Sequence, residues 1–143
     1  MGKMLYLNEK NEFYLMMDDS LYRINLGSMS VKKVVEGLST GSYCASESNR
    51  YFAWVDSANQ YSSSTIKVMD LKSGKTFEVK KGDDQYLRPL GFIGEDFIYG
   101  QANAADVVSD AAGNTTFPMN GLIILDTSDQ SELKTYTLSL IHI

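Results

Sequence analysis

The sequence of 143 residues predicts an all-β protein made of repeated four-stranded antiparallel units. Two observations predict this class. Short runs rich in Tyr, Phe, Val, Ile and Thr alternate with clusters of Gly, Asn, Asp and Ser at intervals of about 8–12 residues. No segment carries the sustained apolar stripe of an amphipathic helix. The periodicity therefore favours strands along the whole chain.

Each unit is predicted to hold four strands, and the units recur at spacings near 45 residues. The four expected strands are, in order, residues 4–8, 11–18, 21–25 and 31–35 in the first unit, 43–47, 49–56, 66–70 and 76–80 in the second, and 87–93, 95–99, 122–126 and 132–137 in the third. Asn11 aligns with Asn49 at an offset of 38, and Phe52 with Phe97 at an offset of 45. We expect blades at about 4–36, 43–81 and 87–137, within one unit spanning 1–137.

The second unit indicates how these units pack. Tyr51, Ala53 and Val55 alternate with Phe52 and Trp54, so both faces of this strand are apolar. A strand that is apolar on both faces is expected to lie between two neighbouring layers. Tandem four-stranded meanders of this kind are typical of β-propeller blades. The predicted fold class is therefore all-β, a partial β-propeller of about three four-stranded antiparallel blades in tandem.

Two segments of the second unit resemble a known family. The stretch Ser46-Glu47-Ser48-Asn49-Arg50-Tyr51-Phe52-Ala53-Trp54 is similar to the blade signature of TolB-like (WD-repeat-like) β-propellers, and Asp70-Leu71-Lys72-Ser73-Gly74-Lys75 resembles that family's turn between the third and fourth strands. The first and third units keep only the turn character, at residues 9–11 and 94–96. The resemblance implies protein partners and a bacterial parent protein that is exported or attached to the cell envelope.

The function expected from these observations is a non-catalytic binding or scaffold module for protein or peptide partners, with no cofactor. The long polar segment Gln101–Asn120 is the expected binding loop, bordered by Tyr61 and Ser62–Ser64. One alternative is the propeller domain of a larger hydrolase related to prolyl oligopeptidase. Another is a self-contained all-β domain of a different kind.

Candidate catalytic and metal-binding residues have simpler interpretations, so no catalytic, cofactor or metal residue is assigned. Ser39 lies in a G-x-S-x-G pattern, but no helix pattern follows it, and a flexible loop between two units is expected. Cys44 is expected to be a buried thiol. The carboxylates are expected in exposed turns, because they lack the spacing of a calcium loop: Asp18, Asp19, Asp83, Asp84, Asp106 and Asp110. Asp18 and Asp56 are expected at equivalent turn positions. Asn114 begins a glycosylation sequon.

Charge and composition exclude several other classes. The formal net charge of −5 argues against binding to a nucleic-acid backbone. The single cysteine excludes an internal disulfide, and no apolar run is long enough to cross a bilayer. The N-terminal residues lack the pattern of a signal peptide. These observations do not assign a compartment.

The six C-terminal residues, Leu138-Ser139-Leu140-Ile141-His142-Ile143, match the translation of a transposon sequence used in library preparation. We expect this tail to be foreign and the natural gene to continue past Thr137. His142, the only histidine, would then be foreign too. The other interpretation is an ordinary terminal strand, since the six residues are apolar and partly alternating.

Three blades are too few for a closed propeller, which typically has four to eight. Two blade faces are then expected to be bare, within Met4–Leu26 and Leu87–Leu125. We predict that the purified chain associates or aggregates, because bare apolar faces are removed from water by contact with each other. Size-exclusion chromatography tests this expectation, and a clean monomer at high concentration would contradict it.

Overall fold

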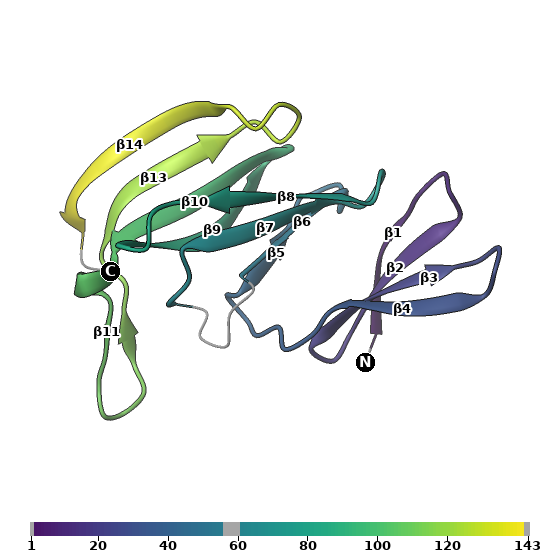
Figure 1. Ribbon diagram of the computed structural model, residues 1–143, viewed down its shortest axis with the longest axis horizontal. Coiled ribbons are helices and arrows are strands. Elements are labelled where there is room, and N and C mark those ends of the chain that lie inside the picture. Colours follow the sequence, from purple (N-terminus) through teal and green to yellow (C-terminus); the bar gives the residue numbers. More distant parts are fainter. Residues whose placement is uncertain (1, 56–60, 142–143) are drawn as a thin grey trace.

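The computed structural model describes residues 2–55 and 61–141, except for the side chains of residues 138–141. Three four-stranded antiparallel sheets follow one another along the chain (Figure 1). The first contains β1 (Gly2–Leu7), β2 (Glu12–Met17), β3 (Ser20–Asn25) and β4 (Ser30–Val35), the second β5 (Tyr43–Ala45), β6 (Tyr51–Trp54), β7 (Thr65–Asp70) and β8 (Lys75–Lys80), and the third β9 (Gln85–Ile93), β10 (Asp96–Asn103), β13 (Met119–Leu125) and β14 (Glu132–Ile141). We call these sheets blades 1, 2 and 3.

Each blade is a meander in which sequence neighbours pair, and the blades stack face to face. One core lies between blades 1 and 2, and contains Tyr14, Met16, Leu21, Leu38, Phe52, Trp54, Met69 and Leu71. A second core lies between blades 2 and 3, and contains Tyr51, Ala53, Val55, Ile66, Val68, Val79, Leu87, Phe97, Tyr99, Ile123 and Leu125. Tandem meanders packed in this way form a partial β-propeller, as predicted.

Strand β6 is the element that joins the two cores. All four of its residues are buried. Phe52 and Trp54 pack toward blade 1, whereas Tyr51 and Ala53 pack toward blade 3. The expectation that both faces of this strand are covered is therefore confirmed. The aromatic contacts are close: the ring centroids of Phe52 and Trp54 lie 5.9 Å apart.

The alignment of blades 1 and 2 differs by one residue from the offset of 38. That offset holds at the turn, where Asn11 and Asn49 both have positive φ. The turn of blade 2 is one residue longer, because Asn8 N donates to Glu12 O, whereas Ser46 N donates to Tyr51 O. Between β2 and β6 the offset is therefore 39. Phe13, not Tyr14, is the structural equivalent of Phe52, and the offset of 45 from Phe52 to Phe97 holds.

The segment between β10 and β13 contains more structure than the loop expected at Gln101–Asn120. β10 continues to Asn103 and β13 begins at Met119, so both ends of the expected loop are strand. Between them lie η1 (Ala104–Asp106) and a hairpin of β11 (Val108–Ser109) and β12 (Thr115–Thr116). We call Ala104–Pro118 the insertion. Figure 1 shows its hairpin extending away from the three sheets.

The structure also describes the ends of the repeat. β14 runs to Ile141, so the backbone of residues 138–141 continues this strand, and His142 lies outside the described residues. Asp56 lies outside them as well, so its expected equivalence with Asp18 has no structural counterpart here. In the described parts of the chain, no helix has the length and apolarity needed to cross a membrane.

Trp54 tests the core between blades 1 and 2. Its side chain is 4% exposed, and its indole N–H has no hydrogen-bond partner among the described residues. Trp54→Ala should lower the free energy of unfolding by about 3–5 kcal/mol, because it opens a cavity between two blades. Trp54→Phe should cost less than about 1.5 kcal/mol, because it keeps most of the packing. Urea unfolding followed by circular dichroism measures both values, and equal losses for the two variants would contradict this packing.

Candidate functional site

The loops of the three blades lie at two opposite ends of the sheets. One end, which we call the turn end, holds the β1–β2, β3–β4, β5–β6, β7–β8, β9–β10 and β13–β14 turns. The other, which we call the insertion end, holds the β2–β3 turn, residues 61–64, the links between blades and the insertion. In Figure 1 the hairpin and the link between β4 and β5 lie on the same side of the molecule.

Backbone hydrogen bonds hold the base of the insertion end together. Leu87 N donates to Ser63 O over 2.7 Å, which ties the loop of blade 2 to β9. Ala104 N donates to Asp84 O over 2.8 Å, which ties the insertion to the β8–β9 link. Below the insertion, the Met119 side chain packs over Gly100, where an added Cβ would collide with it. The insertion therefore begins and ends on a fixed base.

Aromatic side chains from blades 2 and 3 meet at this end. Tyr61 borders the insertion, as expected from the sequence. The Tyr61 and Phe117 ring centroids lie 6.5 Å apart. The guanidinium carbon of Arg88 lies 5.4 Å from the Tyr61 ring centroid, which is a cation–π distance. Phe117 is buried and Tyr61 is half-buried. Tyr61, Arg88 and Phe117 thus form a cluster contributed by residues far apart in the sequence.

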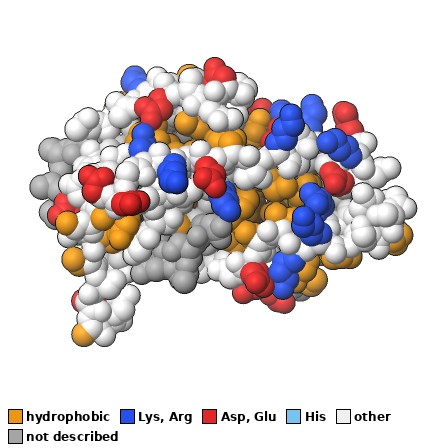
Figure 2. All heavy atoms as spheres, in the orientation of Figure 1, with side chains coloured by type: hydrophobic (Ala, Val, Ile, Leu, Met, Phe, Trp, Pro, Cys, Tyr) orange, Lys and Arg blue, Asp and Glu red, His pale blue; other side chains and the backbone are white. Residues whose placement is uncertain are grey.

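The hairpin that follows the base of the insertion is short and exposed, and it protrudes from the rest of the molecule (Figure 1 and Figure 2). Val108 pairs with Thr116 and Ser109 with Thr115. The Asp110 carboxylate closes the turn by accepting hydrogen bonds from the backbone N–H groups of Ala112 and Asn114, both at 2.9 Å. These bonds hold the pKa of Asp110 below its ordinary value. Asp110 therefore has a local structural role in the hairpin, in line with the expectation for an exposed turn carboxylate.

A polar cavity of about 370 Å³ lies beside the base of the insertion. Three amide side chains and a charged side chain form a chain of hydrogen bonds along this region, from Gln101 through Gln85 and Asn103 to Asp106. Lys81 and Glu132 form an ion pair of 2.9 Å at its edge, and this hydrogen bond raises the pKa of Lys81. Gln85, Gln101, Lys81 and Glu132 line the cavity, so it offers both donors and acceptors.

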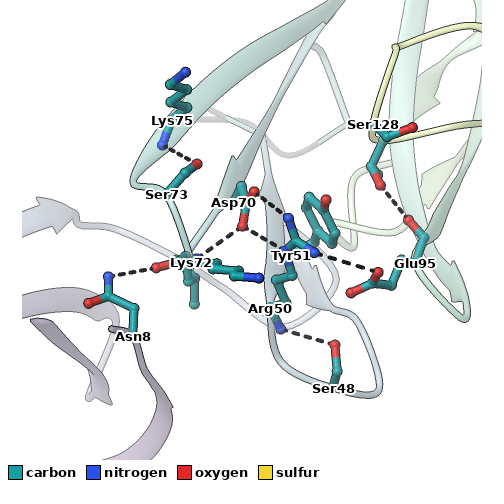
Figure 3. Close-up of polar contacts among 12 residues, drawn as sticks. Asn8, Ser48, Arg50, Tyr51, Asp70, Lys72, Ser73, Lys75, Glu95 and Ser128 are labelled. Atoms are coloured by element: carbon teal, nitrogen blue, oxygen red, sulfur yellow. Dashed lines mark hydrogen bonds and ion pairs between the residues drawn. The ribbon is translucent and has the colours of Figure 1, made fainter. Parts of the chain in front are cut away.

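A different polar network lies at the turn end (Figure 3). Arg50 donates two hydrogen bonds to Asp70, from Nε and Nη2, each of 3.0 Å. The Arg50 guanidinium also lies 3.8 Å from a Glu95 carboxylate oxygen in blade 3. Asp70 accepts a further bond from Lys72 N over 3.0 Å, as Asn25 and Asp126 accept bonds from backbone N–H groups in the equivalent turns. This network fixes turns and links blades 2 and 3.

Sequence-predicted residues occupy several separate places. Ser39 lies between β4 and β5, where its backbone N–H donates to the Ser42 hydroxyl and its carbonyl accepts the Ser42 N–H. Burial raises the pKa of the partly buried Cys44 to about 12, so its thiol is protonated at neutral pH. Asp18 and Asp19 lie in the β2–β3 turn, whereas Asp83 and Asp84 lie in the β8–β9 turn. In the described ranges, no three His, Cys, Asp or Glu side chains converge as a metal site would require.

The β11–β12 hairpin and the hydrogen-bonded series of amide side chains are not among the predictions from the sequence. A signal for the hairpin exists, because Val107-Val108 and Thr115-Thr116 are β-branched pairs on either side of a turn-forming Asp110–Asn114. The chain of Gln85, Gln101 and Asn103 has no such signal, since it depends on the pairing of β9 with β10.

No protein-family model matches the chain, and no curated protein matches it. Solved structures with partial similarity include U3-55K, with 11% identity, a TM-score of 0.45 and coverage of 95% of this chain and 42% of that one. The Cps50 (Swd1) β-propeller domain of Myceliophteria thermophila has 14% identity, a TM-score of 0.30 and coverage of 97% and 55%. A chain of the mitotic checkpoint complex has 8% identity, a TM-score of 0.31 and coverage of 91% and 61%.

This chain therefore spans about 42–61% of the length of the three solved chains. The fold assignment above rests on the sheet topology and on the two cores between blades. The specific resemblance to TolB-like propellers has no counterpart in these comparisons.

The Arg50–Asp70 pair gives a pH-dependent contribution to stability. Burial opposes ionisation of Asp70, but the bonds from Arg50 and Lys72 outweigh it and lower its pKa below the ordinary 3.8. The contribution is therefore present above pH 3.8 and is lost as the pH falls through the folded-state pKa. Asp70→Asn should lower the free energy of unfolding by about 1 kcal/mol at pH 7, a value kept small because the Arg50 side chain is 30% exposed.

The difference in the free energy of unfolding between wild type and Asp70→Asn should shrink as the pH falls below 3.8. Urea unfolding at a series of pH values measures it. Asp84→Asn is the control, because Asp84 is an exposed turn residue at the insertion end and its substitution should change stability by less than about 0.5 kcal/mol. A difference for Asp70→Asn that stays constant down to pH 2 would contradict this account.

Proposed function

We propose that the chain is a non-catalytic β-propeller module that binds a protein or peptide partner through its insertion end. The observation that carries the proposal is the meeting of Tyr61, Arg88 and Phe117 at the base of an exposed hairpin. Tyrosine, arginine and phenylalanine are among the side chains enriched in protein interfaces. Loops held on a rigid scaffold are also where binding residues concentrate.

The charge at this end suggests the chemistry of the partner. Asp83, Asp84, Asp106 and Asp110 are all exposed. Arg88 and Lys81 are cations at this end, and both are engaged, Arg88 with the Tyr61 ring and Lys81 with Glu132. A partner segment with lysine or arginine side chains and an apolar anchor fits such a surface, because opposite charges favour encounter and correct orientation. The neighbouring polar cavity offers amide groups for hydrogen bonds to a partner backbone.

The base of the insertion supports this function by limiting the cost of binding. The bonds Leu87 N to Ser63 O and Ala104 N to Asp84 O fix the two flanking segments before a partner arrives. A surface that is already ordered loses less conformational entropy on binding. The hairpin itself adds little to the core, because β11 is exposed and its pairing with β12 is confined to two residue pairs.

Trimming the hairpin tests the proposal. Because Val108 pairs with Thr116, Ser109–Thr115 can be replaced by an Asn-Gly turn without moving the ends of the insertion. We expect the melting temperature to change by less than about 2 °C, because little buried surface is removed. We expect partner affinity to fall by about tenfold or more, as for loss of a contributing interface segment.

The measurement is affinity purification of partners with the tagged chain, followed by titration of the recovered partner against each variant. Lys72→Ala, an exposed substitution at the turn end, is the matched control and should retain full affinity. Retention of full affinity by the trimmed variant would exclude the hairpin from the interface. Equal loss for Lys72→Ala would place the interface at the turn end instead.

A further inference from the structure

Blades 1 and 3 each have one apolar face with no neighbouring sheet among the described residues. Strand pairing identifies the bare face of blade 1, because residues opposite each other in a sheet share a face. Leu15 pairs with Met4 and Tyr22, and Phe13 pairs with Leu7 and Ile24, on the side away from Tyr14 and Met16. The bare face of blade 1 therefore carries Met4, Leu7, Phe13, Leu15, Met17, Tyr22, Ile24 and Val31, together with Lys33, which pairs with Tyr22.

The bare face of blade 3 is identified in the same way. Ile98 pairs with Ile124, and Leu122 pairs with Tyr136, on the side away from Phe97 and Tyr99. This bare face contains Leu90, Ile93, Ile98, Leu122, Ile124 and Tyr136, together with the charged residues Arg88, Asp96 and Lys134. Side chains on both faces are strongly exposed: Met4 and Val31 are each 64% exposed on blade 1, and Ile93 is 62% exposed on blade 3.

The two bare faces are of the same two kinds that pack together between blades 1 and 2 and again between blades 2 and 3. Phe13 is the structural equivalent of Phe52 and Phe97. Phe52 faces blade 1 and Phe97 faces blade 2, so each packs against the preceding blade. Phe13 lies on the bare face of blade 1, where the described residues provide no preceding blade. This face is therefore built to receive a preceding blade.

The bare face of blade 3 corresponds to the face that packs against a following blade. Tyr14 of blade 1 and Ala53 of blade 2 are equivalent, and each packs toward the following blade. Their equivalent in blade 3 is Ile98, which lies on the bare face. The bare face of blade 3 is therefore of the kind that packs against a following blade. Placed against the bare face of blade 1 from another molecule, it repeats the contact between blades 1 and 2.

We propose that a second copy of this chain covers both faces, with blade 1 of each copy packed on blade 3 of the other. Such a pair has two identical head-to-tail contacts and six blades, within the range of about four to eight found in closed propellers. Closure removes the exposed methionine, isoleucine and valine side chains from water, which favours the pair.

Charged substitutions on the bare faces test the pair. Val31→Glu places a carboxylate on the bare face of blade 1, and Ile93→Glu places one on the bare face of blade 3. Both residues are already exposed within one molecule, so folding should be retained, which circular dichroism checks. Val108→Glu is the matched control, because Val108 is an exposed valine in the hairpin and lies on neither face.

Sedimentation velocity gives the mass of each species. Wild type and Val108→Glu should each sediment at twice the 15.9 kDa chain mass. Val31→Glu alone and Ile93→Glu alone should each be monomeric, because every head-to-tail contact needs one face of each kind. An equimolar mixture of the two variants should form a one-to-one pair, since each retains the face that the other lacks.

Other results would overturn the proposal. Monomeric wild type would mean that something other than a second copy covers these faces, such as further blades of a longer parent chain. A dimer of Ile93→Glu with a monomer of Val31→Glu would show that two blade 1 faces meet each other. A mixture that stays monomeric at the highest soluble concentration would exclude the head-to-tail contact, and wild-type assemblies that keep growing with concentration would exclude closure.

Discussion

The structure depends on the burial of strand β6 from both sides. Phe52 and Trp54 join the core with blade 1, and Tyr51 and Ala53 join the core with blade 3. A strand with one polar face could not hold two layers together, because one of the cores would then contain unpaired polar groups. The adjacent strand β7 continues the same arrangement, with Val68 directed to one core and Met69 to the other.

This constraint determines where variation is tolerated. The turns at the turn end are tied by carboxylate and amide caps, at Asn25, Asp70 and Asp126, and by the Arg50 network between blades 2 and 3. The segments at the insertion end need not share one length or conformation from blade to blade, because they connect strands that are already paired. An irregular insertion there leaves both cores unchanged, which is why the proposed binding surface lies at that end.

The fold class, the order of strands and the two apolar faces of Tyr51–Val55 could be predicted, because alternation and turn residues are local properties. The alignment of Phe13 with Phe52 could not, because it depends on a single extra residue in the β5–β6 turn that changes which side chains share a face. The expected loop Gln101–Asn120 does lie between the second and third strands of blade 3, but both of its ends are strand and its centre holds a hairpin that was not predicted. The cluster of Tyr61, Arg88 and Phe117 needed the packing of two blades.

Hydrogen exchange measured by mass spectrometry tests the stacking of the blades most directly. Because blade 2 is covered on both faces within one molecule, the amides of β6 and β7 should exchange most slowly in the chain. In the monomeric Val31→Glu variant, the amides of β1 and β4 in blade 1 should exchange faster, since one face of that blade is then bare. Exchange in β6 and β7 as fast as in β1 would contradict the account, because it would mean that blade 2 does not lie between two packed sheets.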